Sequence, residues 1–551
     1  IAWAAESGAI DQDIAAWDWV TLPERLKNDE LTEDDLDRAR AQVAVFLRQF
    51  SKAQIIDLAI ERKLLLAPVM TTEDLVRSPH HAGRNFYRQL ARDGKGAVTL
   101  PGDFAMNVPA AFVPLRPAPA LGEGNRDFAD GWPGGERPVP VPAAPAAAPL
   151  AGIKVLDLAW VVAGPLIGRA LADFGATVVR VESSRRIETA RMMGPFPGGK
   201  VDPERSALYD TCNAGKFGLA LDLASEEGRA VVRDLVRWAD VVVESFSPGQ
   251  MARWGLGYDQ LRDLNPSLIM LSTSLMGQSG PYTSYAGFGN VGASVSGYQA
   301  IVGHPDGVPV GPFGPYTDFV GPRFGLVALL AALEQRRRSG EGGWLDVSQA
   351  EAGVQLLAPY IAKYSIDGEI IELRGNRDPQ LAPNAVFACL SDSGAQAWIA
   401  ISVRDDSDWR KLAQCLGVAA LDQDERFATL AGRKAHEDEL EQLLDEALSG
   451  REALALERAL QALGLPAHRV VSSQDMAGDE HLAARGYFVR MPRDGGGACV
   501  VESARYLLSD TPARVERSAP GFGRDKLHVL KTLLNYSDGR IEALDAAGVL
   551  A

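Results

Sequence analysis

Two stretches of this sequence, 401 residues apart (481 − 80), repeat each other. Residues 66–87 (LAPVMTTEDLVRSPHHAGRNFY) match residues 466–488 (PAHRVVSSQDMAGDEHLAARGYF). The matched positions pair His80 with His481, Arg84 with Arg485, and Phe86 with Tyr487. Solenoid and propeller repeats span only about 20–50 residues. The distance therefore indicates that a whole enzyme-sized unit is duplicated, the alternative being a chance similarity of two short helical stretches.

The second copy opens at Leu150. A first copy of equal length would begin about 250 residues before Ile1 (150 − 401 = −251), so we expect the chain to be part of a longer polypeptide. Residues 1–125 are then the C-terminal part of the first copy. Residues 126–149, which are rich in Pro and Ala and lack apolar periodicity, are predicted to form a semi-extended linker.

The amino-acid composition disfavours some classes of binding partner and favours one cellular compartment. The net charge of −16 (56 basic minus 72 acidic residues) disfavours a surface for nucleic acid or for an anionic membrane, but it allows a local basic pocket. No uninterrupted apolar run reaches about 18 residues, so we expect no membrane span. The four cysteines have no CxxC spacing, which favours free thiols in a reducing cytoplasm. Seven histidines without an HExxH motif give no support to a metal site.

From Leu150 onward, short apolar strands alternate with amphipathic helices. Helices are expected at about 165–174 and 225–239. Strands are expected at 153–158, 177–182, 218–223, 241–246 and 268–273. Such alternation is typical of a parallel, doubly wound sheet. The predicted fold class is therefore α/β with a Rossmann-like large domain at 150–365, whose ligands bind at the loops beyond the carboxyl ends of the strands.

After the large domain the pattern changes. A smaller α+β domain is predicted at 366–497. A strand-like sequence, ACVVE, follows at 498–502, and residues 526–549 are interpreted as one helix. Residues 498–551 are therefore expected to return to the large domain.

A series of short loops, each next to an expected strand, carries the functional signal. They are VVAGPL (161–166), CNAGK (212–216), ESFSPGQMARWGLGY (244–258) and TSLMGQSGPY (273–282), together with PYTDFVGP (315–322). As an ordered set, these loops resemble the class III coenzyme A transferase family, which includes formyl-CoA and carnitine-CoA transferases. The resemblance covers nearly all of residues 150–551. In contrast, the sequence has no GxxxxGK[ST] and no GxSxG motif, which disfavours a P-loop enzyme and a serine hydrolase.

The resemblance implies a coenzyme A site on these loops. The residues implied to contact the cofactor-like substrate are Val162, Ala163, Asn213, Lys216, Ser245, Phe246 and Arg253. Amides near Ala163 would approach a phosphate or thioester at a helix start, Lys216 and Arg253 would supply cations, and Phe246 would cover the adenine or pantetheine. Without the resemblance, a tight turn, solvated surface charge and core packing would explain the same residues.

Asp318 aligns with the nucleophilic aspartate of the family, in a loop that leads into an apolar helix beginning near Phe324. An ionised carboxylate near a helix N-terminus can attack a thioester, although Asp is also a common N-cap. The resemblance implies transfer of coenzyme A from an acyl-CoA donor to a carboxylic acid, through an aspartyl anhydride and an aspartyl-CoA thioester. It also implies that Gly375 and Asn376, otherwise a simple turn, donate to the developing oxyanion. Coenzyme A is then a substrate, with no prosthetic group and no metal.

Some positions depart from the family pattern. Val162 stands where formyl-CoA transferases carry Gln, and Leu275-Met276 replaces Gly-Phe. An arginine of the family is replaced by Ser183, for which Arg185 or Arg186 could substitute. These changes leave the acceptor and the adenine contacts open. Three apolar residues suggest an acyl group larger than formate or oxalate: Phe288, Phe313 and Tyr316.

Two other functions stay open. An α-methylacyl-CoA racemase-like enzyme needs a His for proton transfer, and the corresponding loop at 286–290 (AGFGN) has none. A non-catalytic acyl-CoA-binding repeat is the other alternative. Class III transferases are homodimers whose chains thread through each other, so we expect either a homodimer or an intramolecular pseudo-dimer of two repeats.

Overall fold

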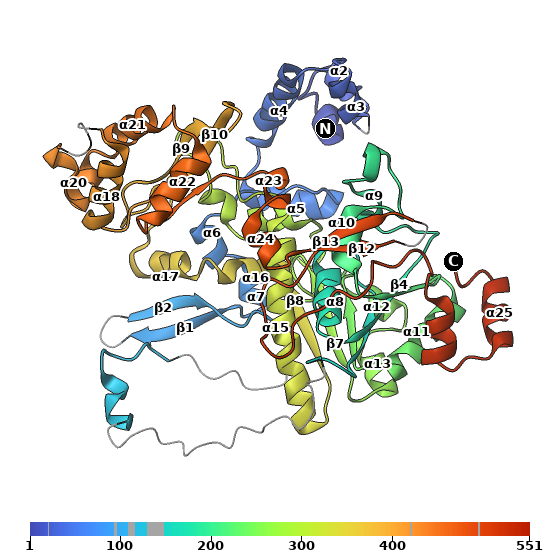
Figure 1. Ribbon diagram of the computed structural model, residues 1–551. Helices are drawn as coiled ribbons and strands as arrows, with labels where there is room; N and C mark the ends of the chain where they lie inside the picture. Colours follow the sequence, from blue (N-terminus) through green and yellow to red (C-terminus); the bar gives the residue numbers. More distant parts are fainter. Residues whose placement is uncertain are drawn as a thin grey trace.

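The computed structural model (Figure 1) describes residues 1–19, 21–92, 96–107, 116–128, 148–418, 421, 423–493 and 496–551. At its centre lies a six-stranded sheet in which all neighbouring strands are parallel. In spatial order the strands are β5 (Phe217–Ala220), β4 (Thr177–Glu182), β3 (Lys154–Asp157), β6 (Val241–Glu244), β7 (Ile269–Ser274) and β8 (Gly343–Ser348). The order reverses between β3 and β6, as in a doubly wound fold. The predicted α/β fold class is therefore confirmed.

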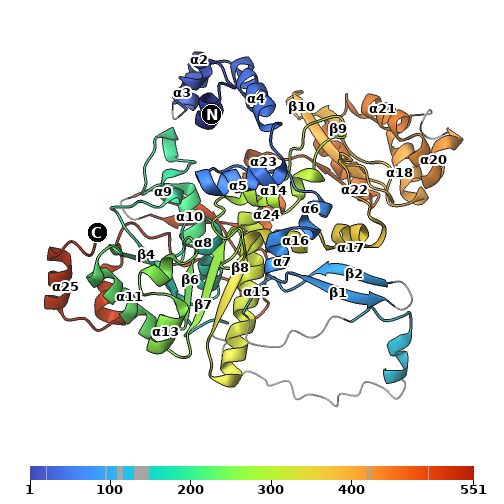
Figure 2. The same ribbon diagram turned by 180° about the vertical axis from the view of Figure 1, so that it is seen from behind.

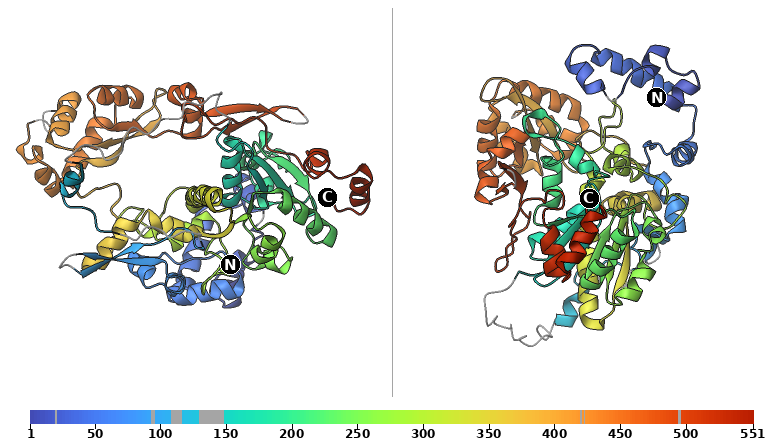
Figure 3. Two further views of the ribbon diagram at one scale, coloured as in Figure 1. Left: turned by 90° about the horizontal axis from the view of Figure 1, so that it is seen from below. Right: turned by 90° about the vertical axis from the view of Figure 1, so that its right-hand side faces the viewer.

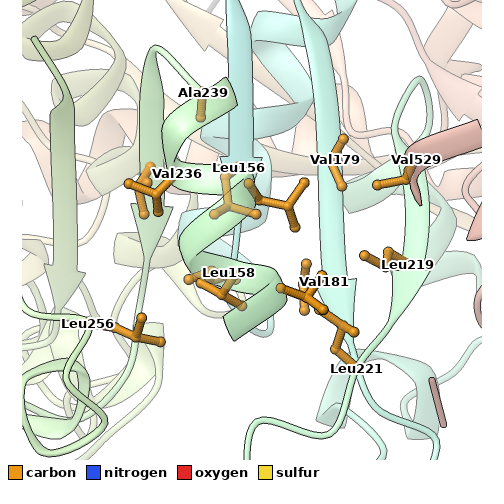
Figure 4. Close-up of a cluster of buried hydrophobic side chains, with 14 of the residues drawn as sticks. Leu156, Leu158, Val179, Val181, Leu219, Leu221, Val236, Ala239, Leu256 and Val529 are labelled. Carbon is orange, nitrogen blue, oxygen red and sulfur yellow. The ribbon is translucent and has the colours of Figure 1, made fainter. Parts of the chain in front are cut away.

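Helices cover both faces of the sheet, so both faces are buried. One face packs on α11 (Glu226–Trp238), α13 (Tyr258–Leu264) and the π-helix η5 (His528–Leu533), and Figure 4 shows part of this core around Leu156, Val179 and Leu219. The other face packs on α8 (Ala163–Asp173) and α15 (Tyr316–Ser339). Burial on both faces explains why the strands are nearly continuous apolar runs.

The α15 helix is long and apolar enough to cross a membrane. However, half of its most apolar 18-residue segment is buried inside the protein. It contacts α8, α14 (Gly289–Val295) and α16 (Gln349–Gln355). These contacts are those of a core helix. Its apolar residues, such as Leu326 and Leu329, belong to the core of the sheet domain.

The start of α15 differs from the prediction. The helix begins at Tyr316, so Asp318 lies in its first turn rather than in a loop before it. Pro322 inside the helix lacks an N–H, which removes the hydrogen bond to the carbonyl of Asp318. Although Pro322 is the seventh residue of the helix, the helix continues through it to Ser339.

Two further differences lie in the large domain. The strand β8 was not predicted, although it forms one edge of the sheet. Residues 526–549 were predicted to be one helix, and this was wrong: η5 and α25 (Asp538–Ala546) are separated by a turn. Asn535 in that turn has a φ of +55°, a left-handed conformation that ends a helix.

The small domain is built around an antiparallel sheet of β9 (Asn384–Leu390), β10 (Gln396–Ser402) and β11 (Ala467–Arg469). Its helices are α18 (Asp406–Leu416), α20 (Leu430–Ala435), α21 (Glu437–Leu448) and α22 (Ala453–Ala462), with η4 (Glu425–Phe427). They enclose a separate core that includes Phe387, Trp409 and Phe427. The domain stands to one side of the large sheet, to which α17 (Ala358–Asp367) connects it (Figure 1).

The N-terminal part begins with helices that have a small core of their own. They are α1 (Ala2–Glu6), α2 (Gln12–Ala15), α3 (Leu22–Lys27) and α4 (Glu33–Leu47), and the core joins α1, α2 and α4. The following elements lie along the large domain (Figure 2): α5 (Lys52–Arg62), α6 (Thr72–Val76), α7 (Pro79–Gly83) and the hairpin of β1 (Tyr87–Arg92) and β2 (Gly96–Pro101). The 3-10 helix η1 (Glu123–Phe128) follows, and most of the predicted linker lies outside the described residues.

Elements of the repeated stretches correspond one to one. In the C-terminal stretch α23 (Ser473–Ala477), α24 (Glu480–Ala484) and the hairpin of β12 (Phe488–Pro492) and β13 (Ala498–Glu502) follow the order of α6, α7, β1 and β2. Both stretches open with a capping box, Thr71 with Asp74 and Ser472 with Asp475. Seen from below, the two hairpins lie on opposite sides of the molecule (Figure 3).

The remaining short elements connect these parts. They are α9 (Thr189–Met192), η2 (Pro197–Gly199), α10 (Ala207–Asn213), α12 (Gln250–Arg253) and η3 (Tyr298–Ala300). The α10 helix contacts α8 and β13, so the C-terminal hairpin returns to the large domain.

Candidate active site

A cavity of about 400 Å³ opens at the carboxyl edge of the sheet, where the strand order reverses. It is lined by residues 160–164, 186, 245–248, 250, 254, 273–275, 283–288, 318 and 349. These residues come from the end of β7, from the segments that follow β3, β4, β6 and β7, including the starts of α8 and α12, and from the first turns of α15 and α16. A doubly wound sheet places its ligands in this crevice. Of the predicted site residues, the cavity brings together Val162, Ala163, Ser245, Phe246 and Asp318.

Asp318 lies at the inner end of α15, and its side chain is buried, with 5% exposed. The backbone N–H of Gly289 donates to its Oδ2 at 3.0 Å, and the Gln349 side chain donates as well. Burial raises the pKa of this carboxyl to about 6, while the two hydrogen bonds lower it. A carboxylate with this pKa is largely ionised at neutral pH and is less solvated than a surface Asp, which suits a nucleophile.

Two glycines of α14 allow this approach to Asp318. A Cβ atom at Gly289 would lie 2.4 Å from the carbonyl oxygen of Pro315, and one at Gly292 would lie 2.0 Å from Thr317 Oγ1. Thr317 Oγ1 donates to the carbonyl of Gly289. The start of α14 is thus locked against the first turn of α15, which fixes the Gly289 N–H on the carboxylate.

The loop after β3 is held against the loop after β6. The N–H of Trp160 donates to Ser245 Oγ at 2.8 Å, and Ser245 Oγ donates back to the Trp160 carbonyl at 3.2 Å. A Cβ atom at Gly164 would lie 2.3 Å from Ala159 Cβ. Gly164 is therefore needed where α8 starts beside the cavity.

Aromatic side chains form one wall of the cavity. Phe246 packs against Trp254 at 5.0 Å between ring centroids and against Trp160 at 6.2 Å. Of the three apolar residues expected around the acyl group, Phe288 lines the cavity, whereas Phe313 is fully exposed and Tyr316 packs against Tyr298. The wall suits a flat or extended apolar group.

Arg186 is the one basic residue among the described residues that line the cavity. Its guanidinium lies 5.2 Å from the ring centroid of Trp160. Arg185, by contrast, pairs with Asp222 and bonds to the carbonyl of Gly548. Arg253 is exposed and does not line the cavity, but it bonds to Gln250, a residue of the lining. Arg186 is therefore the cation that the structure brings closest to a ligand in this space.

Lys216 and Asn213 do not line the cavity. Lys216 is fully buried behind α8, where Nζ donates to Asp157 Oδ2 at 2.6 Å, to the Pro165 carbonyl and to Asn213 Oδ1. Burial lowers the pKa of its ammonium group to about 8, and Asp157 raises it. Lys216 and Asn213 therefore hold the first turn of α8 on the side away from the cavity. A contact of either residue with coenzyme A, as predicted, would require a different arrangement of these side chains.

Gly375 and Asn376 also lie outside the cavity lining. The N–H of Gly375 donates to the carbonyl of Gly303 at 2.9 Å, and the carbonyl of Asn376 accepts from the Asn384 side chain. In this arrangement the donor that faces Asp318 is Gly289 rather than either of these residues. Sequence reasoning missed Gly289 because it treated 286–290 only as a loop without His.

The N-terminal stretch supports the cavity from behind. Its Ala59 and Leu66 pack with Leu275, Met276 and Tyr285, the last of which lines the cavity. The Tyr285 hydroxyl donates to the Leu66 carbonyl at 2.5 Å. The loop that forms one side of the cavity is therefore fixed by residues more than 200 positions earlier in the chain.

His80 and Arg84 complete this contact. His80 Nε2 donates to the Met276 carbonyl at 2.8 Å and Nδ1 accepts from the Tyr282 N–H at 3.1 Å, which defines a neutral imidazole. Burial lowers the His80 pKa to about 4, in agreement with that state. Arg84 pairs with Glu351 and Asp346 and bonds to Ser279. The sequence marked His80 and Arg84 as repeated residues but not as supports of the site.

Comparison with known proteins places the chain in a family. The sequence profile of CoA-transferase family III matches residues 150–526. A Chloroflexus aurantiacus protein named succinyl-CoA–D-citramalate CoA-transferase is 33% identical over 404 residues, 73% of this chain and 98% of the relative. An Agrobacterium fabrum protein named succinate–glutarate CoA-transferase is 35% identical over 387 residues, 70% of this chain and 96% of the relative.

A solved structure agrees. The crystal structure of a CAIB/BAIF family protein from Brucella suis matches 70% of this chain and 100% of its own, with a TM-score of 0.64 and 30% identity. The profile match covers more than half of the chain, and the relatives are covered almost completely. The chain therefore belongs to CoA-transferase family III and is an enzyme of this class.

Proposed function

We propose that the protein moves coenzyme A from an acyl-CoA donor to a carboxylic acid with Asp318 as the nucleophile. The observation that carries the proposal is the state of this side chain. Asp318 is the one carboxylate among the described residues that line the cavity, it is buried, and its pKa is about 6. A desolvated, ionised carboxylate facing a cavity is equipped to attack a thioester carbonyl.

The reaction balances in four steps. A carboxylate oxygen of Asp318 attacks the donor thioester, and the C–S bond breaks to give an acyl-aspartyl anhydride and the coenzyme A thiolate. The thiolate attacks the aspartyl carbonyl, which releases the donor carboxylate and leaves an aspartyl-CoA thioester. The acceptor carboxylate attacks this thioester and forms a second anhydride with release of the thiolate. Attack of the thiolate on the acceptor carbonyl then gives the new acyl-CoA and frees Asp318.

The cavity walls supply the other parts of this proposal. Oxyanions develop at each attack, and a preorganised N–H such as that of Gly289 stabilises nearby negative charge. Arg186 is available for a phosphate or a carboxylate of the substrate. Phe246 and Trp254 offer apolar surface to pantetheine. Coenzyme A is a substrate throughout, and no prosthetic group takes part.

The four cysteines are unpaired, which supports a reducing cytoplasm as the compartment of the protein.

A racemase is the weaker candidate. Proton transfer at the α-carbon of an acyl-CoA needs a second titratable group beside the aspartate. Among the described residues that line the cavity, none is a histidine. Phe288 occupies the loop where that histidine would be expected.

The test is a transfer assay by mass spectrometry with full-length protein, acyl-CoA donors and free acids, begun with succinyl-CoA against citramalate and glutarate because the relatives carry those names. Incubation with donor alone should leave coenzyme A bound to the peptide that contains Asp318. Transfer that is lost in Asp318→Asn, together with this adduct, supports the proposal. Binding of coenzyme A without transfer would favour the non-catalytic repeat, and exchange of the α-proton would favour the racemase.

We also propose that the protein acts as an intramolecular pseudo-dimer of two repeats. The stretch with Arg84 is buried against the large domain, whereas its repeat is exposed at His481 and Arg485. The large domain of this chain is already occupied by its own N-terminal stretch. The exposed stretch therefore needs a second sheet domain with a free surface, which a preceding repeat would supply.

The mass of the full-length polypeptide in solution tests this arrangement. A monomer whose Arg485 is protected from exchange or modification would support the pseudo-dimer. A stable homodimer in which Arg485 crosses to the other chain would replace it with the homodimer.

A further inference from the structure

A strained residue lies in the wall of the cavity. Val161 has a φ of +64°, the left-handed region, and it lines the cavity between Trp160 and the start of α8. A β-branched residue is disfavoured there, because its Cβ substituents crowd the backbone. Such a conformation persists only where surrounding contacts enforce it.

The contact that enforces it comes from Glu188. The N–H of Val161 donates to Glu188 Oε1 at 3.1 Å. Glu188 is 1% exposed, and its other oxygen pairs with Arg180, which is fully buried. Arg180 also bonds to the carbonyl of Ala159, two residues before Val161. A buried carboxylate and its partner thus hold the loop on both sides of Trp160.

The segment that carries Glu188 also touches the cavity itself. Arg186, two residues earlier, lies over the Trp160 ring at 5.2 Å and lines the cavity. The segment 186–188 therefore contacts the ring of Trp160 through Arg186 and the backbone N–H of Val161 through Glu188. On the opposite side Trp160 is bonded to Ser245. Without the hydrogen bond to Glu188, Val161 would relax to a negative φ. This change would reorient the cavity wall at Trp160 and Val161 and the first residues of α8.

We infer that Glu188 is a positioning residue, which clamps Val161 in its left-handed conformation and so fixes the wall that receives coenzyme A. It acts through Val161 and has no place in the cavity lining. The inference rests on the proposed function, because that function assigns coenzyme A to this cavity. The clamp itself concerns binding rather than the chemical steps.

The test measures the Kd for coenzyme A by calorimetry, and KM and kcat for the acyl-CoA donor. Glu188→Leu removes the acceptor of the Val161 N–H and should raise both Kd and KM at least tenfold, with kcat changed less than threefold. Glu188→Gln keeps an acceptor oxygen and should stay within threefold of wild type. In a Val161→Gly background, Glu188→Leu should raise Kd less than threefold, because glycine adopts this φ without strain.

Glu182→Leu is the matched control, since Glu182 is a buried carboxylate whose side-chain hydrogen bonds come from Arg191 and Tyr209 and not from Val161. It should lower the thermal midpoint as much as Glu188→Leu does, without a change in Kd. Three results would each overturn the inference: equal effects of the two Leu variants on Kd, an effect of Glu188→Gln as large as that of Glu188→Leu, or an undiminished effect of Glu188→Leu in the Val161→Gly background. Failure of the proposed function would appear differently, as absence of transfer in wild-type protein that still binds coenzyme A.

Discussion

Arg84 donates to both carboxylate oxygens of Glu351, at 2.6 and 2.9 Å, across 267 residues of sequence. Both side chains are buried, and Asp346 adds a second carboxylate to the same guanidinium. We expect Arg84→Met to destabilise the protein by about 3–5 kcal/mol, because two buried carboxylates would lose their partner. Chemical denaturation measures this loss.

Arg485→Met is the control for that prediction. Arg485 occupies the matching position of the repeat but is exposed, and among the described residues its side chain makes one hydrogen bond, to the Arg505 carbonyl at 3.2 Å. This variant should change the free energy of unfolding of the present chain by less than about 0.5 kcal/mol. Equal losses of unfolding free energy in the two variants would mean that the ion pair between Arg84 and Glu351 contributes little to stability.

Acid should loosen the N-terminal stretch. Burial lowers the pKa of both His80 and His81 to about 4, against an ordinary value of 6.5. The folded state therefore binds fewer protons, so the stability from each neutral histidine is full above pH 6.5 and is lost as pH falls toward 4. The shift corresponds to about 3 kcal/mol for each group.

Hydrogen exchange at residues 70–90 measures this loosening. Protection should fall between pH 6.5 and 4, after correction for the intrinsic rate. Replacement of the exposed His304 by Gln should leave the pH dependence unchanged. Constant protection over that range would contradict the assignment of both histidines as buried and neutral.

Asp318→Asn should make the protein more stable as well as inactive. The folded pKa of about 6 lies above the ordinary value of 3.8, so the carboxyl stabilises the fold fully below pH 3.8 and loses that contribution as pH rises through 6. A neutral amide avoids the loss, which amounts to about 3 kcal/mol at neutral pH. Denaturation at neutral pH should show the gain, and denaturation below about pH 4 should not. A gain of equal size at both values would point to a cause other than ionisation.

The same group sets the pH dependence of the reaction. Because Asp318 attacks only as a carboxylate, kcat/KM for the donor should be flat above its pKa of about 6 and fall tenfold for each pH unit below it. At neutral pH Asp318→Asn should reduce kcat by a factor of about 10³ or more. An acid limb far from pH 6 would assign the nucleophile, or its pKa, elsewhere.

Gly289→Ala should impair the reaction without unfolding the chain. The new methyl group would meet the Pro315 carbonyl at 2.4 Å and push α14 away from the first turn of α15. Misplacement of a reacting group by about 1 Å costs roughly 10²-fold in rate. Gly539→Ala, which meets nothing within 4 Å, should leave the rate unchanged. A crystal structure of the Gly289 variant would show whether the Asp318 carboxylate has moved.

Much of the large domain followed from local sequence pattern. Strands such as 241–244 carry valine on both faces and sit next to strong helical patterns, so the apolar run located them. β8 was missed because Gly343, Asp346 and Ser348 interrupt its apolar run. The early start of α15 was missed because Pro322 suggests a boundary, whereas the helix continues through this proline.

The local sequence pattern does not predict which side chains pair when they are far apart in the chain. Lys216 stands in a loop motif beside Asn213, and no local signal tells whether its ammonium group faces solvent or Asp157. The sequence likewise marks Arg84 and Arg485 as equivalent. Only the packed structure distinguishes the buried one from the exposed one, because burial depends on which domain lies next to each stretch.

The long separation between Arg84 and Glu351 has a consequence during synthesis. At about 5–20 residues per second, a ribosome makes Glu351 roughly 15–50 s after Arg84. Throughout this interval His80 and Arg84 lack the residues of this sheet domain, Met276 and Glu351, that they contact in the folded chain. The nascent chain therefore carries an unfinished interface that other strands could pair with. We expect the yield of native protein to depend on how well cellular chaperones shield residues 59–106 until the last strand of the sheet has emerged.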